Sequence, residues 1–170
     1  KYIMFFDADE FLIADDLLKG KSLYQILDSV FKRQKKIACL GINWLIFGSS
    51  NLVEDPEDGV INAFTHCARD EFEWNQLVKS CVIPSKIIGW VNPHLPLQAF
   101  GYKKINLDAK KKKIRLYHYF VKNKKHFEEK VNKGMADRNA KRSMDEFYYY
   151  DKNDVINYKA ISVRDYILKK

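Results

Sequence analysis

The sequence predicts an α/β fold in which a mixed sheet is flanked by helices and followed by a helical C-terminal segment. Three observations support this class. An apolar run at residues 2–6 ends in carboxylates, an amphipathic pattern follows at 22–34, and a second apolar run at 37–47 leads into an acidic loop at 48–59. Strand, helix, strand and loop in this order is the alternation typical of an α/β sheet.

The first apolar run predicts a buried strand that delivers acids into a loop. Residues 2–6 are apolar, and Asp7, Asp9 and Glu10 follow them closely. Open α/β sheets place their ligands at the carboxyl ends of strands, so this loop is the first candidate site.

The helix predicted at residues 22–34 has a start signal and a periodic apolar face. Ser22 and Gln25 have the spacing of a capping box. Apolar residues then recur on one helical face, at Leu23, Ile26, Leu27, Val30 and Phe31. The strand predicted at 37–47 is apolar almost throughout, which favours a strand buried on both faces.

The middle of the chain predicts shorter elements. Residues 60–69 are expected to form a short helix, and residues 78–83 a strand that Pro84 ends. Residues 89–96 (GWVNPHLP) are expected to form a loop without regular structure, because two prolines within four residues remove backbone donors and fix φ.

The last third predicts a hairpin and then helices. Two strands around the lysine-rich turn at 110–113, the second at 114–120, are expected to pair with each other. Helices are expected at 124–133, ended by Gly134, at 144–150 after a Ser143/Glu146 capping box, and at 163–169 after a Ser162/Asp165 box. Residues 1–122 thus hold the candidate site, and 123–170 form a basic helical extension packed on the same domain.

The net charge of +8 is divided unevenly along the chain. Residues 1–60 carry −3, residues 61–100 carry 0, and residues 101–170 carry +11. A uniformly basic surface for nucleic acid is therefore not expected, and no nucleic-acid partner is predicted. With 46% hydrophobic and 31% charged residues, the composition indicates a soluble globular domain rather than a disordered chain or a membrane span.

The cysteines give a hint about the compartment. Cys39, Cys67 and Cys81 are odd in number and form no C-x-x-C pair. Neither a disulfide framework nor a zinc ribbon is expected, and a reducing environment fits best.

Asp7 and Asp9 are candidate ligands of a divalent cation. Residues i and i+2 of an extended segment point the same way, so both carboxylates can meet one ion. Two oxygen donors leave positions around Mg²⁺ or Mn²⁺ open for water and substrate phosphate. The alternative is that the acids only mark the solvent end of a strand. Glu10 and the preceding apolar run favour the metal site.

Residues 5–12 (FFDADEFL) resemble the metal-binding segment of glycosyltransferases with the two-layered nucleotide-sugar fold called GT-A, in particular the bacterial family-2-like and family-92-like enzymes. Further segments agree with this family in the same order: Trp44 with 47–50 (FGSS), 78–80 (VKS), Pro93 with His94, and 117–120 (YHYF) followed by Lys122, Phe127, Lys130 and Gly134. The resemblance covers most of residues 2–134, and the later residues add little to it.

The resemblance implies a metal-dependent transferase that moves a sugar from a nucleotide-diphosphate sugar to a hydroxyl of a glycan or lipid-linked acceptor. Asp9 would bind the metal directly, Asp7 would contact the ribose or the ion through water, and His118 would complete the metal sphere. The cofactor, Mn²⁺ or Mg²⁺, would stabilise the charge that develops on the leaving diphosphate.

Four further residues are candidates for substrate binding. Trp44 would stack on a sugar, Lys79 and Lys122 would lie near phosphate, and His94 would contact the diphosphate or the acceptor. Each has a structural alternative as a core aromatic, a solvated lysine or a structural histidine. An inverting reaction also needs a carboxylate base; Glu10 is a candidate for this catalytic role, and Glu54, Asp55 and Asp58 stay open beside it.

The same resemblance implies a setting. Bacterial members commonly build surface polysaccharide or lipopolysaccharide, which implies a cytoplasmic enzyme at the inner membrane face, touching it through the basic C-terminal region. Members usually have a long segment before the Asp-x-Asp that holds base and ribose, and here six residues precede it. We therefore expect an N-terminally truncated catalytic domain, whose residues 1–122 hold the metal and acceptor side and which alone binds the donor weakly or is inactive.

Two other function classes stay open. A haloacid-dehalogenase-like phosphatase also uses a strand followed by Asp-x-Asp, but such enzymes usually have Gly, Thr or Val soon after the second Asp, where this chain has Glu10 and Phe11. A non-catalytic module would use the C-terminal charge of +11 to bind anionic polysaccharide, membrane or nucleic acid.

Overall fold

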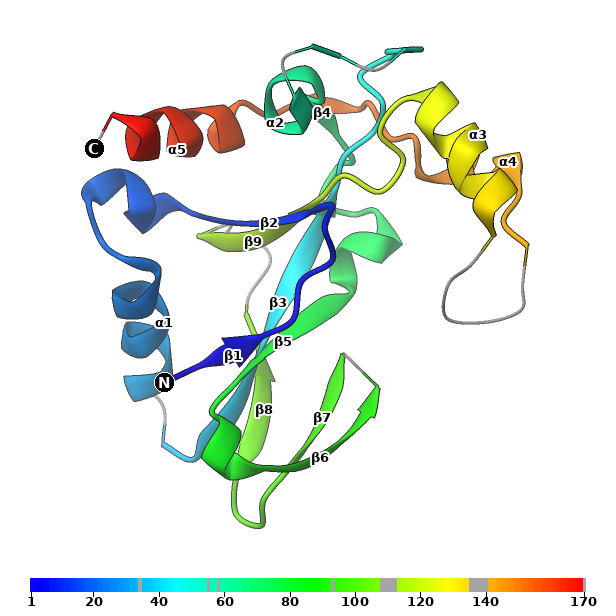
Figure 1. Ribbon diagram of the computed structural model, residues 1–170. Helices are drawn as coiled ribbons and strands as arrows, with labels where there is room; N and C mark the ends of the chain where they lie inside the picture. The colour runs from blue at the N-terminus through cyan, green and yellow to red at the C-terminus, as the bar shows by residue number, and fades with distance from the viewer. Residues whose placement is uncertain are drawn as a thin grey trace.

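The computed structural model describes residues 1–33, 35–54, 56–57, 59–92, 94–107, 113–134 and 141–169, and it confirms the α/β class. Its main sheet is mixed and six-stranded, with the order β1-β5-β3-β9-β2 and with β8 also paired to β3 (Figure 1). These strands are β1 (Ile3–Met4), β2 (Glu10–Ala14), β3 (Ile37–Ile46), β5 (Val78–Val82), β8 (Lys103–Asn106) and β9 (Ile114–His118).

Strand β3 is the centre of this sheet. All ten of its residues are buried, as the unbroken apolar run predicts. It pairs antiparallel with β5 along one edge, and along the other edge it pairs in parallel first with β8 and then with β9. Because both edges of β3 are paired, the strand is held in place, and so are the neighbouring strands β5 and β9 that pair with it.

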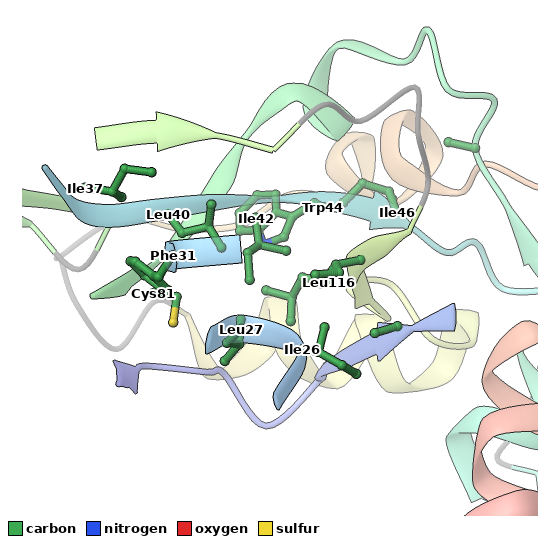
Figure 2. Packing of buried hydrophobic residues seen from close by; sticks show 13 residues of the cluster. Ile26, Leu27, Phe31, Ile37, Leu40, Ile42, Trp44, Ile46, Cys81 and Leu116 are labelled. Atoms are coloured by element: carbon green, nitrogen blue, oxygen red, sulfur yellow. The ribbon is translucent and has the colours of Figure 1, made fainter. Parts of the chain in front are cut away.

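Helix α1 (Leu23–Lys32) covers one face of the sheet, and its capping box is confirmed. Ser22 Oγ accepts a hydrogen bond from the backbone N–H of Gln25 at 3.2 Å, and Gln25 Oε1 accepts one from the backbone N–H of Ser22 at 2.8 Å. Figure 2 shows the buried side chains of the helix packed on this face: Ile26, Leu27 and Phe31 with Leu40, Ile42, Cys81 and Leu116.

The opposite face of the sheet is covered by α5 (Lys159–Leu168). Leu45 and Tyr117 alternate with the residues that face α1, and they pack with Ala160 and Val163 of this helix. The remaining helices are α2 (Gly59–Ala63), α3 (Lys124–Lys133) and α4 (Met144–Tyr150), and a small sheet joins β4 (His66–Cys67) to β10 (Val155–Ile156). Among the helices of the described segments, none is long and apolar enough to cross a membrane.

The first strand differs from the buried strand expected at residues 2–6. Only Ile3–Met4 pair with β5, at the edge of the described sheet, and Phe5 and Phe6 are 55% and 44% exposed. Tyr2 and Met4 pack against the core beneath α1, whereas the end of the apolar run lies at the surface because only one side of β1 is paired in the described sheet.

The loop expected at 89–96 is wrong. Residues Ile87–Asn92 form β6 and Leu95–Gln98 form β7, which pair as an antiparallel hairpin with two register shifts. Pro93 lies outside the described residues. Pro96 is tolerated because a two-stranded sheet leaves each strand one edge that needs no donor.

The hairpin expected around 110–113 is also wrong. β8 and β9 do not pair with each other but follow one another along the same edge of β3, both parallel to it. The central strand offers more buried pairing surface than a lone hairpin does. Residues 110–112 lie outside the described residues.

The helix ends are only partly as predicted. The helix expected at 60–69 ends at Ala63, and β4 follows. Helix α4 begins after Ser143, but that side chain makes no capping bond. Helix α5 begins at Lys159, four residues before the predicted start, so Ser162 lies inside it and donates to the Tyr158 carbonyl.

Gly48 is expected to tolerate no side chain. A Cβ at this position would lie 2.5 Å from the backbone oxygen of Lys152, and backbone cannot move aside as a flexible side chain can. We expect Gly48→Ala to lower the free energy of unfolding by about 3 kcal/mol. Gly89→Ala is the matched control, because its Cβ meets Leu97 at an ordinary 3.7 Å. Equal urea midpoints for the two variants would contradict this packing.

Candidate functional site

The Asp7-Ala8-Asp9 segment forms a turn rather than the extended segment expected from its spacing. The backbone N–H of Glu10 donates to the carbonyl of Asp7 at 3.0 Å, and Glu10 Oε2 accepts the backbone N–H of Asp7 at 2.9 Å. The turn joins β1 to β2 at the sheet end where β3 and β9 also stop (Figure 1). As a result, Asp7 and Asp9 have different cationic partners.

Lys79 is the partner of Asp7. Its Nζ lies 2.7 Å from Asp7 Oδ2 and 3.6 Å from Glu10 Oε2. The lysine lies on the central part of the sheet, where β5 pairs it with Ile42, and its side chain is only 4% exposed. The Glu10 side chain is fully buried, while that of Asp7 is 63% exposed. Lys79 is thus a buried ammonium, not the solvated lysine of the structural alternative.

His118 and Lys130 are the partners of Asp9. His118 Nε2 lies 3.5 Å from Asp9 Oδ1, and Lys130 Nζ lies 3.4 Å from Asp9 Oδ2. His118 is placed by the pairing of β2 with β9, in which it lies opposite Glu10. Lys130 comes from α3 and is held by the Phe120 carbonyl at 2.9 Å and by the Phe120 ring below it.

The environment of Asp9 keeps its carboxylate ionised. Burial raises its pKa, but the hydrogen bond and charge of His118 and the charge of Lys130 outweigh burial and bring the pKa down to about 2. Burial lowers the pKa of Lys130, and the nearby Lys122 adds to this while Asp9 opposes it. Asp9 therefore carries its negative charge at every physiological pH.

We expect the lowered pKa of Asp9 to make the free energy of unfolding fall in acid. A carboxyl group whose pKa is lowered on folding stabilises the fold above its unfolded pKa of 3.8 and loses that effect as the pH falls towards 2. We expect the contribution to be about 2 kcal/mol. The free energy of unfolding of the wild type should exceed that of Asp9→Asn near neutral pH, and the difference should shrink between pH 4 and pH 2. A difference that does not change with pH would contradict the shifted pKa.

Trp44 and His94 complete the aromatic side of the site. The Trp44 ring lies 4.6 Å from the His118 ring and 5.8 Å from that of His94, between centroids. Trp44 is buried, so it supports His118 rather than offering an open face for stacking. His94 Nδ1 donates to the Val78 carbonyl at 3.1 Å, and Ser80 Oγ donates to the His94 carbonyl at 2.7 Å.

Three buried polar atoms of this cluster have no hydrogen-bond partner in the described part of the chain. They are Glu10 Oε1, Trp44 Nε1 and His118 Nδ1. Buried polar groups are nearly always satisfied in folded proteins, so a concentration of unsatisfied ones points to a water or ligand that completes the network. At these three atoms a water molecule or a polar ligand would find a hydrogen-bond partner in this cluster.

The donor chemistry fits a divalent cation in part. Asp9 and His118 supply an oxygen and a nitrogen at one place, which suits Mn²⁺ and leaves room for phosphate oxygens. The described segments contain no group of three or more His, Cys, Asp or Glu side chains arranged to hold a metal. An ion at Asp9 would therefore take most of its ligands from substrate and water, and it would displace Lys130 from the carboxylate.

The other candidates are placed as follows. Lys122 is half-buried in the segment between β9 and α3 and has a left-handed φ of 52°. Its positive charge contributes to lowering the pKa of Lys130. Glu54 pairs with Lys125 at 2.7 Å on the surface. Asp55 and Asp58 lie outside the described residues. The Glu10 carboxylate is enclosed, so an acceptor hydroxyl has no access to it as the structure stands.

Lys130 is the site residue that sequence reasoning did not assign. It appeared in the resemblance, but the chain has 30 Lys and Arg residues and no local motif sets this one apart. The available signal was helical spacing. Phe127 is fully buried, and Lys130 three positions later lies on the same side of α3, which turns it towards the protein.

A separate cavity of about 90 Å³ lies away from these carboxylates. It is lined by Leu45, Arg115 and Tyr117 among others, with Asn157 and Lys159 at its side. Arg115 and Tyr117 alternate along β9 with Leu116 and His118, so the cavity is on the face that α5 covers. It is not part of the candidate site.

No protein-family model matches the chain, and no curated protein matches it.

Proposed function

We propose that this chain is part of a metal-dependent glycosyltransferase of the GT-A type, which transfers a sugar from a nucleotide-diphosphate sugar to an acceptor hydroxyl. The observation that carries the proposal is the meeting of Asp9, His118 and Lys130 beside three unsatisfied buried polar atoms. All lie at one end of the sheet, where ligands of α/β proteins bind.

The chemistry of the transfer explains this residue set. When the bond from sugar to diphosphate breaks, negative charge develops on the leaving phosphate oxygens. Asp9 and His118 would hold a Mn²⁺ or Mg²⁺ ion, which, when bound, stabilises that charge. Lys130 adds a cation beside the same place, already partly freed from water by burial, so its attraction to phosphate is stronger than that of a surface lysine.

The remaining residues position these groups. Glu10 binds Lys79 and the backbone of Asp7, which holds the turn in shape. Trp44 supports the His118 ring from the core side. Asp7 is the exposed carboxylate of the turn and is available to a ribose hydroxyl or to metal-bound water. We assign Glu10 a positioning role and leave the acceptor base unassigned.

One alternative is supported by a specific contact. Asp7 is exposed and has its charge balanced by Lys79 at 2.7 Å, which also suits a carboxylate nucleophile of a phosphatase. In that case Asp7→Asn would abolish hydrolysis of a phosphate monoester, and no sugar would be transferred.

A donor screen tests the proposal. The full-length protein is incubated with a panel of nucleotide sugars in Mn²⁺, in Mg²⁺ and in EDTA, and release of the nucleoside diphosphate is measured. We expect turnover on at least one donor, lost in EDTA and restored by Mn²⁺. If no donor gives metal-dependent turnover, and p-nitrophenyl phosphate is hydrolysed instead, the phosphatase replaces the transferase.

A further inference from the structure

The β6–β7 hairpin carries an unusual set of exposed apolar side chains. Pro96 is buried against the main sheet, whereas its neighbours Leu95 and Leu97 are exposed. Exposed apolar residues also occur on β6 and in the turn that follows β7. We call the set the hairpin patch, and it consists of Ile88, Val91, Leu95, Leu97 and Phe100. Several exposed apolar side chains gathered on one short hairpin are typical of an interaction site.

Phe100 is the most exposed member of this patch. It lies in a turn in which Tyr102 N–H donates to the Ala99 carbonyl at 3.0 Å and Gly101 takes the left-handed φ of 81°. The Phe100 side chain is fully exposed. The Phe100 ring therefore adds no buried area to the fold, and together with the other exposed residues of the hairpin it is available to a partner outside the chain.

Lysines lie beside the patch. The Lys86 carbonyl accepts the Ala99 N–H at 2.9 Å, and Lys86 Nζ lies 4.7 Å from the centre of the Tyr102 ring. The Lys36 carbonyl accepts the Lys103 N–H at 2.9 Å. These backbone bonds bring three lysines from three segments to the end of the molecule that carries Phe100. In Figure 1 this is the end where β6, β7 and β8 meet.

The segments that form this end contain no acid. No Asp or Glu occurs in residues 29–53 or in residues 74–107. The C-terminal region, by contrast, mixes its lysines with acids such as Glu128 and Glu129. Apolar side chains bordered by lysines are complementary to an anionic bilayer, which takes apolar side chains below its headgroups and attracts lysines at them.

We propose that the hairpin patch and its lysines Lys36, Lys86 and Lys103 dock this chain on an anionic lipid membrane. Phe100 enters the headgroup region and the lysines lie at its surface. His94 lies in the connection between β6 and β7, and its ring lies against that of Trp44 in the candidate site, so docking of the hairpin holds that site near the membrane. The docking itself does not depend on the transferase activity.

The test is sedimentation with lipid vesicles. Binding of the full-length protein is measured with vesicles of phosphatidylcholine and of phosphatidylcholine mixed with phosphatidylglycerol. We expect binding to the anionic vesicles that weakens with salt. Lys86→Gln/Lys103→Gln should lower the partition coefficient about thirtyfold, and Val91→Ser/Phe100→Ser about tenfold or more. Circular dichroism checks that both variants stay folded.

A charge-matched control separates this surface from the basic C-terminal region. Lys124→Gln/Lys133→Gln removes two exposed lysines of α3 and should leave vesicle binding unchanged. If this control lowers binding as much as the hairpin variants do, or if the folded wild type does not bind anionic vesicles, the proposal is wrong. A dimer in sedimentation equilibrium that Val91→Ser/Phe100→Ser dissociates would instead make the patch an interface between two copies.

Discussion

Replacing Lys79 by methionine is expected to lower the free energy of unfolding by about 3–5 kcal/mol. The methionine fills the same space but leaves the fully buried Glu10 carboxylate without its cation. Burial already raises the pKa of Glu10, and Lys79 is one of the charges that oppose this rise. Urea unfolding at neutral pH measures the loss, and Glu10 should take up a proton on folding in the variant.

Adding Glu10→Gln to Lys79→Met distinguishes the effect of an unpaired buried charge from the effect of altered packing. Gln at position 10 can still accept the N–H of Asp7 but carries no charge. Lys79→Met/Glu10→Gln should therefore be more stable than Lys79→Met by about 2 kcal/mol. If Lys79→Met costs less than about 1 kcal/mol, the value of an exposed ion pair, the buried pair described here does not exist in solution.

Replacing Asp9 by alanine is expected to lower the rate of sugar transfer at least about 100-fold. Loss of a residue that only hydrogen-bonds to a metal ligand already lowers activity about 10-fold to 100-fold, and Asp9 would be a direct ligand. The variant also frees Lys130 and His118 from their carboxylate partner. The loss should fall mainly on kcat at saturating metal, since the ion acts on charge that develops in the transition state.

Asp16→Ala is the matched control for this measurement. Asp16 is also an aspartate in the N-terminal segment, but it pairs with Lys19 and Lys21 at the surface. Its loss should leave kcat and KM unchanged. If Asp9→Ala retains wild-type transfer, or if Asp16→Ala is equally impaired, Asp9 does not hold the metal.

Local sequence signals were sufficient for the elements that depend on local interactions. The capping box at Ser22 and the apolar face up to Phe31 define α1, because the bonds and contacts that form it lie within one stretch of chain. The unbroken apolar run at 37–47 likewise predicts the central strand, since a strand buried on both faces needs no alternation.

Pairing between distant strands was not predictable in the same way. β8 and β9 look like the arms of a hairpin in the sequence, yet each pairs with β3, and the choice depends on which edge of the central strand is open. The β6–β7 hairpin was not predicted because prolines usually interrupt strands. The sequence does not reveal that both strands are edge strands, in which a proline is tolerated.

The candidate site was partly predictable. The carboxylates after the first apolar run could be located because acids at the end of a strand are a local pattern, whereas His118 was named only through the resemblance of its segment to glycosyltransferases. The pairing of each acid with its cation could not be predicted, because Lys79 reaches Asp7 and Lys130 reaches Asp9 from elements distant in the sequence. A chain with many lysines gives no local sign of the one that is buried.

Manganese binding tests whether Asp9 is the metal ligand of this chain. Electron paramagnetic resonance of Mn²⁺ is recorded with the full-length protein and a nucleoside diphosphate, for the wild type and for Asp9→Ala. We expect the wild type to remove the free-ion signal with a stoichiometry of one ion per chain and Asp9→Ala to leave it in place. Equal binding by both proteins, or sugar transfer that proceeds undiminished in EDTA, would contradict this role of Asp9.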